Sequence, residues 1–398
     1  MPATGIARPV EPGLESLYDT VAQRMSTAWR SHDVSKHSRS FRCQCGRHVF
    51  FRNSLCIACS TPLGYLPDRS SVVPLTPGSA PGRWRAADAQ HEYKRCANLD
   101  TPAGCNWLLP ADEAASHCIS CRLDRTIPDL GDADNRLYWS AIEAAKRRLV
   151  SQLLSLGLPV KSKFSEDTER GVMFDFLRSP PGGPRVMTGH ASGLITLNVE
   201  EADHAKREKI RHDLREPYRT LLGHFRHEIG HYYWDRLVWD TAWLERFRGL
   251  FGDERADYAA ALKTNYENGP PADWASRYIS SYASTHPWED WAETWAHYLH
   301  VVDSLGTALG FGLEADDLET DAEPFTRTDL YAPDDPDSDR FLYLLNGWIE
   351  LTMVLNELAR SMGQPDFYPF VMSRPVVAKL QFVHLVVQDA RSHAAAMP

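Results

Sequence analysis

All eight cysteines of this 398-residue chain lie between Cys43 and Cys121, and none follows in the rest of the sequence. They form two groups of four, which are Cys43, Cys45, Cys56 and Cys59, then Cys96, Cys105, Cys118 and Cys121. Four thiolates can complete a tetrahedral zinc site, and a small module without a large core gains much of its stability from such a metal. We therefore predict two zinc ribbons, at 41–66 and 93–125, with one structural zinc each.

The first group departs from the usual spacing, because one residue separates Cys43 from Cys45 where zinc ribbons usually have two. This pair could be a shortened knuckle, or one of the two could fail to bind. His48, His91 and His117 could substitute as ligands, although eight cysteines already fill two sites. Disulfides or free thiols are the alternative to zinc.

Composition divides the chain further. A Pro/Gly/Ser-rich stretch at 72–84 predicts a linker, which we place at 67–92. We expect an N-terminal helical arm at 1–40 and a second domain at 126–398. In that domain the sequence GLITLNV at 193–199 predicts a strand, and an apolar stripe at helical spacing predicts a helix at 135–156. We expect further helices through Leu214 and at 217–239, 254–266, 288–305, 340–362 and 376–390.

The predicted helix at 217–239 contains His227-Glu228-x-x-His231. Histidines four residues apart lie on one face of a helix, so both rings can bind one zinc while Glu228 points toward a water on that metal. Zinc lowers the pKa of such a water to about 7, and a neighbouring carboxylate can take its proton as general base. This pattern predicts a catalytic zinc site; the alternative is a core helix with hydrogen-bonded histidines.

A catalytic zinc usually has three protein ligands. No histidine or aspartate stands after His231 at the spacing that a third ligand from the same motif would need, which disfavours the metzincin arrangement. Glu289 and Glu293 fall on one face of the predicted helix at 288–305. One of them could bind zinc while the other holds a ligand histidine, and the sequence leaves open which does which.

The segments HEIGH and YASTHPWEDWAETWAHYL resemble a bacterial family of zinc-binding metallopeptidases with an N-terminal zinc ribbon, over nearly the whole chain. The pattern Y-x-x-T-x-x-x-E-x-x-A-E is more distantly similar to the anthrax lethal factor protease domain. The resemblance implies a gluzincin-type site in which Glu289 is the third ligand, Glu293 orients a ligand and Tyr282 donates a hydrogen bond to the oxyanion. It also implies a zincin-like fold, in which the strand near 194–197 is an edge that accepts an extended peptide.

The charge of the chain indicates which partners it can bind, and its targeting signals indicate where it is located. The net charge of −10 argues against a protein that coats nucleic acid or an anionic membrane. Seven Lys or Arg residues against one acid between Arg24 and Arg52 nevertheless allow a nucleic acid or a protein partner at the first ribbon. Neither a signal peptide nor a membrane-length apolar stretch is evident, so we predict a cytoplasmic protein without a membrane partner.

Together these features predict an α+β chain with a mainly helical, zincin-like domain, a small sheet and two preceding ribbons. We expect a zinc peptidase with one catalytic and two structural zinc ions that cuts a peptide or isopeptide bond in a peptide or protein substrate. The alternative is a catalytically silent ribbon adaptor that binds protein or nucleic acid. A latent enzyme, covered by its N-terminal arm or by the acidic loop after Gly312, is also conceivable.

Overall fold

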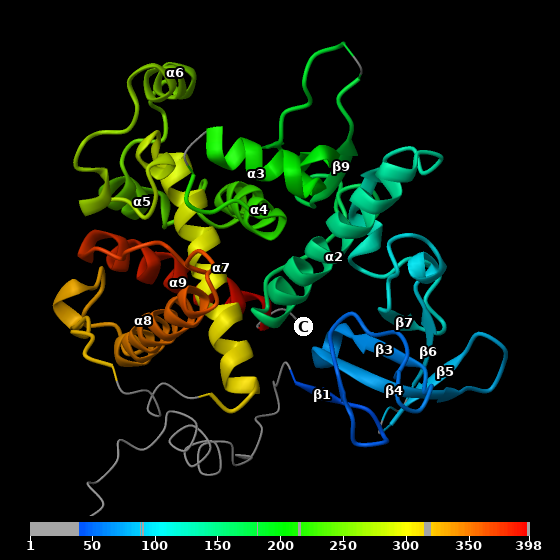
Figure 1. Ribbon diagram of the computed structural model, residues 1–398. Helices are drawn as coiled ribbons and strands as arrows, with labels where there is room; N and C mark the ends of the chain where they lie inside the picture. The colour runs from blue at the N-terminus through cyan, green and yellow to red at the C-terminus, as the bar shows by residue number, and fades with distance from the viewer. Residues whose placement is uncertain are drawn as a thin grey trace, which may run out of the picture.

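The computed structural model describes residues 40–87, 89, 91–180, 182–213, 216–313 and 320–395. The predicted arm at 1–40 lies outside these residues except for Ser40. The described chain forms a cysteine-rich region at 40–123 and a larger, mainly helical domain (Figure 1). This arrangement confirms the predicted α+β class, with a small sheet in the helical domain and the cysteine groups before it.

The cysteine-rich region is built on one antiparallel sheet. Its five strands pair in sequence order and are β3 (Leu63–Leu66), β4 (Ser71–Pro77), β5 (Trp84–Ala86), β6 (Glu92–Arg95) and β7 (Leu108–Pro110). A two-stranded hairpin, β1 (Phe41–Arg42) with β2 (His48–Val49), precedes it. The predicted linker at 67–92 is therefore wrong, since β4 and β5 lie within it.

The linker prediction failed because Pro and Gly mark only a turn. Gly78 N donates to Arg83 O at 2.8 Å across the β4–β5 connection. On either side of this turn, Val72, Leu75 and Ala86 are buried. These side chains give the segment a hydrophobic face, and a strand that buries such a face belongs to a sheet.

The sheet curls so that its ends meet, and both cysteine groups share its core. Tyr65 N in β3 donates to Asn106 O beside β7 at 2.9 Å. The Tyr65 ring lies 4.7 Å from that of Trp107, which is fully buried. The two predicted ribbons are thus parts of one folded unit.

This unit packs on α2 (Ala133–Ser155), the first helix of the larger domain (Figure 1). Tyr65 Oη lies 2.6 Å from Ser151 Oγ, and Arg147 donates to Ala103 O at 2.7 Å. Buried residues of both regions, among them Trp107 and Trp139, also belong to one continuous hydrophobic cluster. The cysteine-rich region is therefore a structural part of the molecule.

The larger domain holds a four-stranded sheet of order β10-β11-β9-β8. Its strands are β8 (Asp124–Thr126), β9 (Met173–Leu177), β10 (Gly189–Ala191) and β11 (Leu194–Asn198), and only β10 runs antiparallel to its neighbour. The strand predicted as the edge, β11, is central, so that expectation is wrong. The edge is β10, because a tight turn at Gly193 folds the preceding residues back onto β11.

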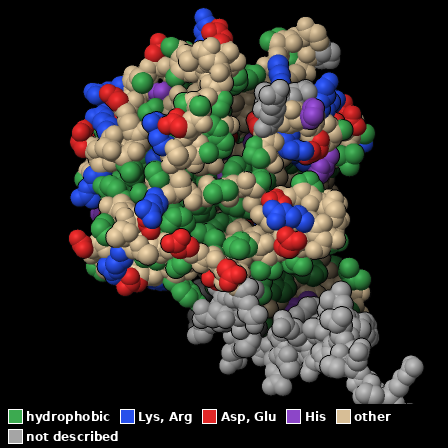
Figure 2. Space-filling view, turned by 60° about the vertical axis from the view of Figure 1, so that its left-hand side comes forward, with side chains coloured by type: hydrophobic (Ala, Val, Ile, Leu, Met, Phe, Trp, Pro, Cys, Tyr) green, Lys and Arg blue, Asp and Glu red, His purple; other side chains and the backbone are tan. Residues whose placement is uncertain are grey.

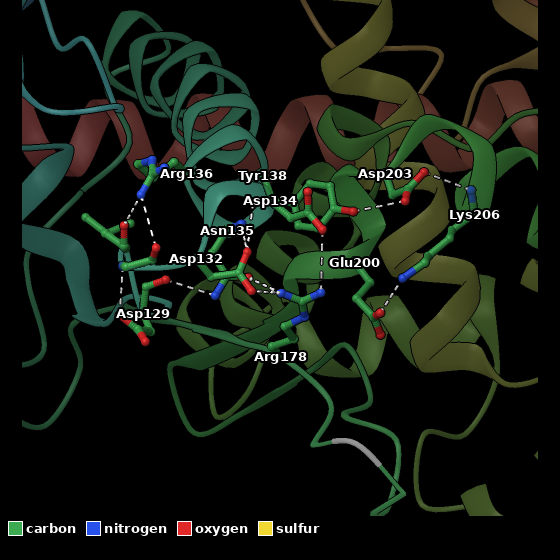
Figure 3. Close-up of polar contacts among 12 residues, drawn as sticks. Asp129, Asp132, Asp134, Asn135, Arg136, Tyr138, Arg178, Glu200, Asp203 and Lys206 are labelled. Carbon is green, nitrogen blue, oxygen red and sulfur yellow. Dashed lines mark hydrogen bonds and ion pairs between the residues drawn. The ribbon is translucent and has the colours of Figure 1, made fainter.

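The start of α2 is tied to the sheet by polar contacts (Figure 3). Asp132 caps the helix by accepting from the backbone N–H groups of Asp134 and Asn135. Arg178, just after β9, donates to Asp132 at 2.8 Å and to Asn135 at 3.0 Å. Tyr138 donates to Asp203, which lies just before α3 (His204–Asp213). These bonds fix the start of α2 beside the end of β9.

The remaining helices are α4 (Leu221–Leu237), α5 (Leu244–Phe251), α6 (Tyr258–Asn268), α7 (Pro287–Gly310), α8 (Ser338–Ser361) and α9 (Arg374–Ala395). The helix predicted from Pro217 begins at Leu221, because Thr220 Oγ1 accepts from Gly223 N at 3.0 Å and caps it there. Phe225 of α4 packs edge-on against Phe174 of β9, with ring centroids 5.6 Å apart.

α7 crosses α4 at Gly230, within the His-Glu-x-x-His motif. A Cβ atom at Gly230 would lie 3.1 Å from Ala292 Cα and 3.2 Å from Trp295 Cβ. Trp291 also donates its indole N–H to Gly230 O at 2.9 Å. Glycine thus permits a close approach of the two helices, and this contact sets Glu289 and Glu293 opposite the two histidines.

A buried ion pair joins α7 to α9. Lys379 Nζ lies 2.6 Å from Asp290 Oδ2, with both side chains almost fully buried. Removing one partner of such a pair typically costs about 3–5 kcal/mol, because a buried charge is left without compensation. We expect Lys379→Met to lower the midpoint of thermal unfolding by roughly 10 °C, measured by calorimetry.

The matched control for this prediction is Lys263→Met. Lys263 and Glu267 form an exposed pair at 3.9 Å. Exposed pairs contribute little, so this variant should unfold at the wild-type temperature. Equal midpoints for the two variants would contradict the role given to the buried pair.

The surface mixes both charge signs. On the face shown in Figure 2, Lys and Arg side chains alternate with Asp and Glu around hydrophobic side chains, and no area of one sign dominates. This face therefore has no broad positive field that would attract a polyanion. Among the described helices, none is long and apolar enough to cross a membrane.

Candidate metal centre and active site

The two cysteine groups bring their sulfur atoms together as predicted. The Sγ atoms of Cys43 and Cys59 lie 3.6 Å apart, those of Cys45 and Cys56 3.8 Å, and those of Cys105 and Cys118 3.7 Å. A disulfide bond would be near 2.05 Å, whereas the edge of a tetrahedron with Zn–S bonds of about 2.3 Å is about 3.8 Å. These distances fit zinc and exclude disulfides between these pairs.

All four thiols of each group fall within reach of one ion, including both members of the Cys43-x-Cys45 pair. The described histidines His48, His91 and His117 belong to neither group. The second group is fully enclosed, while Cys45 and Cys59 of the first are exposed. Cys121 Sγ also lies 3.7 Å from Glu143 of α2, so the second group borders the larger domain.

α4 places the two motif histidines on its α7 side. His227 Nε2 and His231 Nε2 lie 3.2 Å apart, as expected for rings one helical turn apart that converge on one point. Glu289 of α7 meets them, with its Oε2 3.0 Å from His227 Nε2 and 3.6 Å from His231 Nε2. The structure therefore brings together the three residues predicted to bind the catalytic zinc.

Glu293 lies one turn further along α7 and contacts the other nitrogen of the first histidine. Its Oε1 is 2.7 Å from His227 Nδ1, and its Oε2 accepts from Ser280 Oγ at 2.6 Å. Both oxygens of Glu293 are thus occupied away from the point where the rings converge. This geometry favours Glu289 as the ligand and Glu293 as the group that orients His227, of the two arrangements that the sequence left open.

The donor set fits a zinc ion. In the neutral ring, His227 donates its Nδ1–H to Glu293 in a hydrogen bond, so its Nε2 presents a lone pair. Glu289 is buried, and its Oε2 faces the Nε2 atoms of His227 and His231. Two imidazole nitrogens and a buried carboxylate oxygen thus converge within reach of one ion, and this set is typical of catalytic zinc.

A cavity of about 420 Å³ opens beside this centre. Its wall comes from α3, α4, α6 and α7, the segment before β10, and the residues that precede α4 and α7. Members of the wall that bear on chemistry are His227, Glu228, Ser280, Tyr282 and Glu293. The predicted base and the predicted oxyanion donor therefore border the same space as the metal centre.

Burial shifts the pKa values of both Glu228 and Tyr282. Burial raises the pKa of the Glu228 carboxyl, an effect that His227 and His231 partly offset. Burial also raises the pKa of the Tyr282 phenol above its usual range, which keeps it a hydrogen-bond donor. The Tyr282 ring centroid lies 5.9 Å from that of His227.

Family comparison agrees with the site. A family described as "Putative zinc-binding metallo-peptidase" matches residues 135–386, which include every residue of this centre. The chain belongs to this metallopeptidase family. A zinc-ribbon family matches residues 40–132, so one ribbon domain spans both cysteine groups and the interval between them. The predicted membership of a zinc-binding metallopeptidase family with an N-terminal ribbon is confirmed.

Relatives of this chain occur in mycobacteria. Proteins of Mycobacterium tuberculosis and Mycobacterium bovis, both described as uncharacterized, are 40% identical over 353 residues, which are 88% of this chain and 96% of theirs. No solved structure matches the chain. The similarity thus covers the ribbon domain and the metal centre together.

Sequence reasoning missed two residues of this candidate metal centre. Ser280 holds Glu293, and Tyr258 donates to Glu289 Oε1 at 2.7 Å. Ser280 stands two residues before Tyr282, so its proximity could have suggested it. Tyr258 lies 31 positions from Glu289 and belongs to no motif, so no local signal marks it.

Proposed function

We propose that this metallopeptidase hydrolyses peptide or isopeptide bonds at the centre formed by His227, His231 and Glu289. The observation that carries the proposal is their convergence beside a cavity that also contains Glu228 and Tyr282. In this arrangement the three ligands would hold one zinc, and the two cysteine groups would hold one structural zinc each. When bound, the catalytic zinc would acidify a water and polarise the scissile carbonyl.

The chain's own residues account for the remaining chemistry. Glu228, next to His227 on α4, would take a proton from the attacking water and pass it to the leaving amine. Tyr282 would donate a hydrogen bond to the carbonyl oxygen as negative charge develops there. Glu293 would hold His227 in one orientation throughout.

The substrate is proposed to be a peptide or protein segment in extended form. The cavity wall includes residues 185–188, which lead directly into the edge strand β10. A free strand edge can pair with the backbone of an extended peptide and so hold it along the cavity. A protein or nucleic-acid partner at the first cysteine group, and a cytoplasmic location, remain proposals from the sequence.

Tyr282→Phe tests the role of the phenol. Removing one donor to a developing oxyanion typically lowers kcat by about 10²–10³-fold. We expect this loss on a peptide that the wild type cleaves, with zinc content unchanged, because Tyr282 is not a ligand. The cleaved peptide would first be identified by mass spectrometry of a peptide mixture incubated with the enzyme before and after zinc removal.

Tyr343→Phe is the matched control, because Tyr343 is exposed on α8 and lies outside the cavity. It should keep the wild-type kcat. A Tyr282→Phe variant with the wild-type kcat would show that the phenol does not stabilise the oxyanion.

A further inference from the structure

Helix α6 contributes to the metal centre although it packs loosely. None of its residues from Tyr258 to Asn268 is buried. Its start is nevertheless well defined, since Asp257 Oδ1 accepts from Ala260 N at 3.0 Å. This cap places Tyr258, the first residue of the helix, over the N-terminal end of α7.

Tyr258 contacts the third ligand directly. Its hydroxyl donates to Glu289 Oε1 at 2.7 Å. Its ring packs edge-on against His286, with centroids 5.2 Å apart, and against Trp288 at 6.0 Å. The hydroxyl and the ring contacts together give Tyr258 one orientation.

The two oxygens of Glu289 therefore differ. Oε1 accepts from Tyr258, while Oε2 faces the Nε2 atoms of the two histidines. A carboxylate with both oxygens free can bind a metal through both and occupy the position that a catalytic site leaves for water. The hydrogen bond from Tyr258 occupies a lone pair of Oε1 and so disfavours a second bond from Glu289 to the metal.

We propose that Tyr258 is a positioning residue that restricts Glu289 to zinc binding through Oε2 alone. Tyr266, two turns later on the same helix, lines the cavity. α6 thus contributes one residue to the cavity wall and another to the metal centre. The inference rests on the zinc site of the proposed function and does not require that peptides be cleaved.

The test compares the zinc affinity of the full-length wild type with that of Tyr258→Phe. Zinc would be removed from the α4 centre by a chelator that leaves the cysteine sites filled, and added back in competition with a chromogenic chelator. Groups that hydrogen-bond to a metal-binding residue typically contribute about 10- to 100-fold to metal affinity. We therefore expect Tyr258→Phe to bind zinc more weakly by a factor in that range. The visible spectrum of a cobalt-substituted sample should change as well, because the coordination of Glu289 changes.

Tyr266→Phe is the matched control, since it removes a phenol oxygen from the same helix without touching Glu289. It should bind zinc with the wild-type affinity. Equal unfolding temperatures of the zinc-depleted wild type and Tyr258→Phe would establish that the fold is intact. Wild-type affinity and an unchanged cobalt spectrum in Tyr258→Phe, or equal losses in both variants, would overturn the inference. A wild type that takes up no zinc beyond its cysteine sites would overturn the proposed function as well.

Discussion

Glu228→Gln should lower peptide hydrolysis by about 10²–10⁴-fold and leave the zinc content unchanged. Glutamine keeps the shape of the side chain but cannot accept a proton. Glu228 is buried on α4 beside the cavity, and it is absent from the set of three ligands. The loss would therefore come from proton transfer, which kcat on a cleaved peptide measures together with elemental analysis for zinc.

The control for this experiment is Glu267→Gln. Glu267 lies on α6 with its side chain exposed, outside the described cavity wall. The Glu267→Gln variant should cleave the peptide at the wild-type rate. If Glu228→Gln retained full cellular function, the chain would act as an adaptor, and its metallopeptidase fold would serve only as a binding surface.

Cys118→Ser should remove one zinc per chain and destabilise the whole molecule. Cys118 is completely buried, and its group borders α2 through the contact of Cys121 with Glu143. Zinc binding supplies about 10–16 kcal/mol in zinc-finger peptides, which is comparable with the total stability of a typical domain. Even a loss of several kcal/mol would lower the unfolding midpoint by roughly 10 °C or more.

Cys59→Ser provides the comparison within the same fold. Cys59 is exposed, and its group lies beside the short hairpin of β1 and β2. The Cys59→Ser substitution should also remove one zinc. It should lower the unfolding midpoint less than Cys118→Ser does, because fewer buried contacts depend on the first site. Both quantities can be read from elemental analysis and calorimetry. A Cys118→Ser variant as stable as Cys59→Ser would contradict a structural role for the second site in the larger domain.

The parts of the centre that lie within one helix could be predicted from spacing alone. His227 and His231 are one turn apart on α4, and Glu289 and Glu293 are one turn apart on α7, so each pair shares a face whatever the rest of the fold. Which carboxylate faces the histidines depends on how α7 crosses α4 at Gly230. That crossing is a packing contact between distant segments, and spacing does not encode it.

Other features depended on long-range pairing and were missed for that reason. The Pro/Gly-rich stretch predicted a linker, but its residues form a single turn, and the strands beside it are recognised only through the sheet that they complete. Strands β8, β9 and β10 have at most five residues each, too few for a clear periodic pattern. Tyr258 matters only because α6 meets α7, a contact between segments that no motif joins.

The proposed function requires that α4 and α7 hold a zinc ion distinct from those of the cysteine groups. Elemental analysis of zinc per chain, on the purified wild type and on a His227→Ala/His231→Ala variant, tests this requirement. We predict about three zinc ions per chain in the wild type and about two in the variant, since the two cysteine sites would remain filled. The same zinc content in both proteins would contradict this requirement, because the helix would then carry no metal.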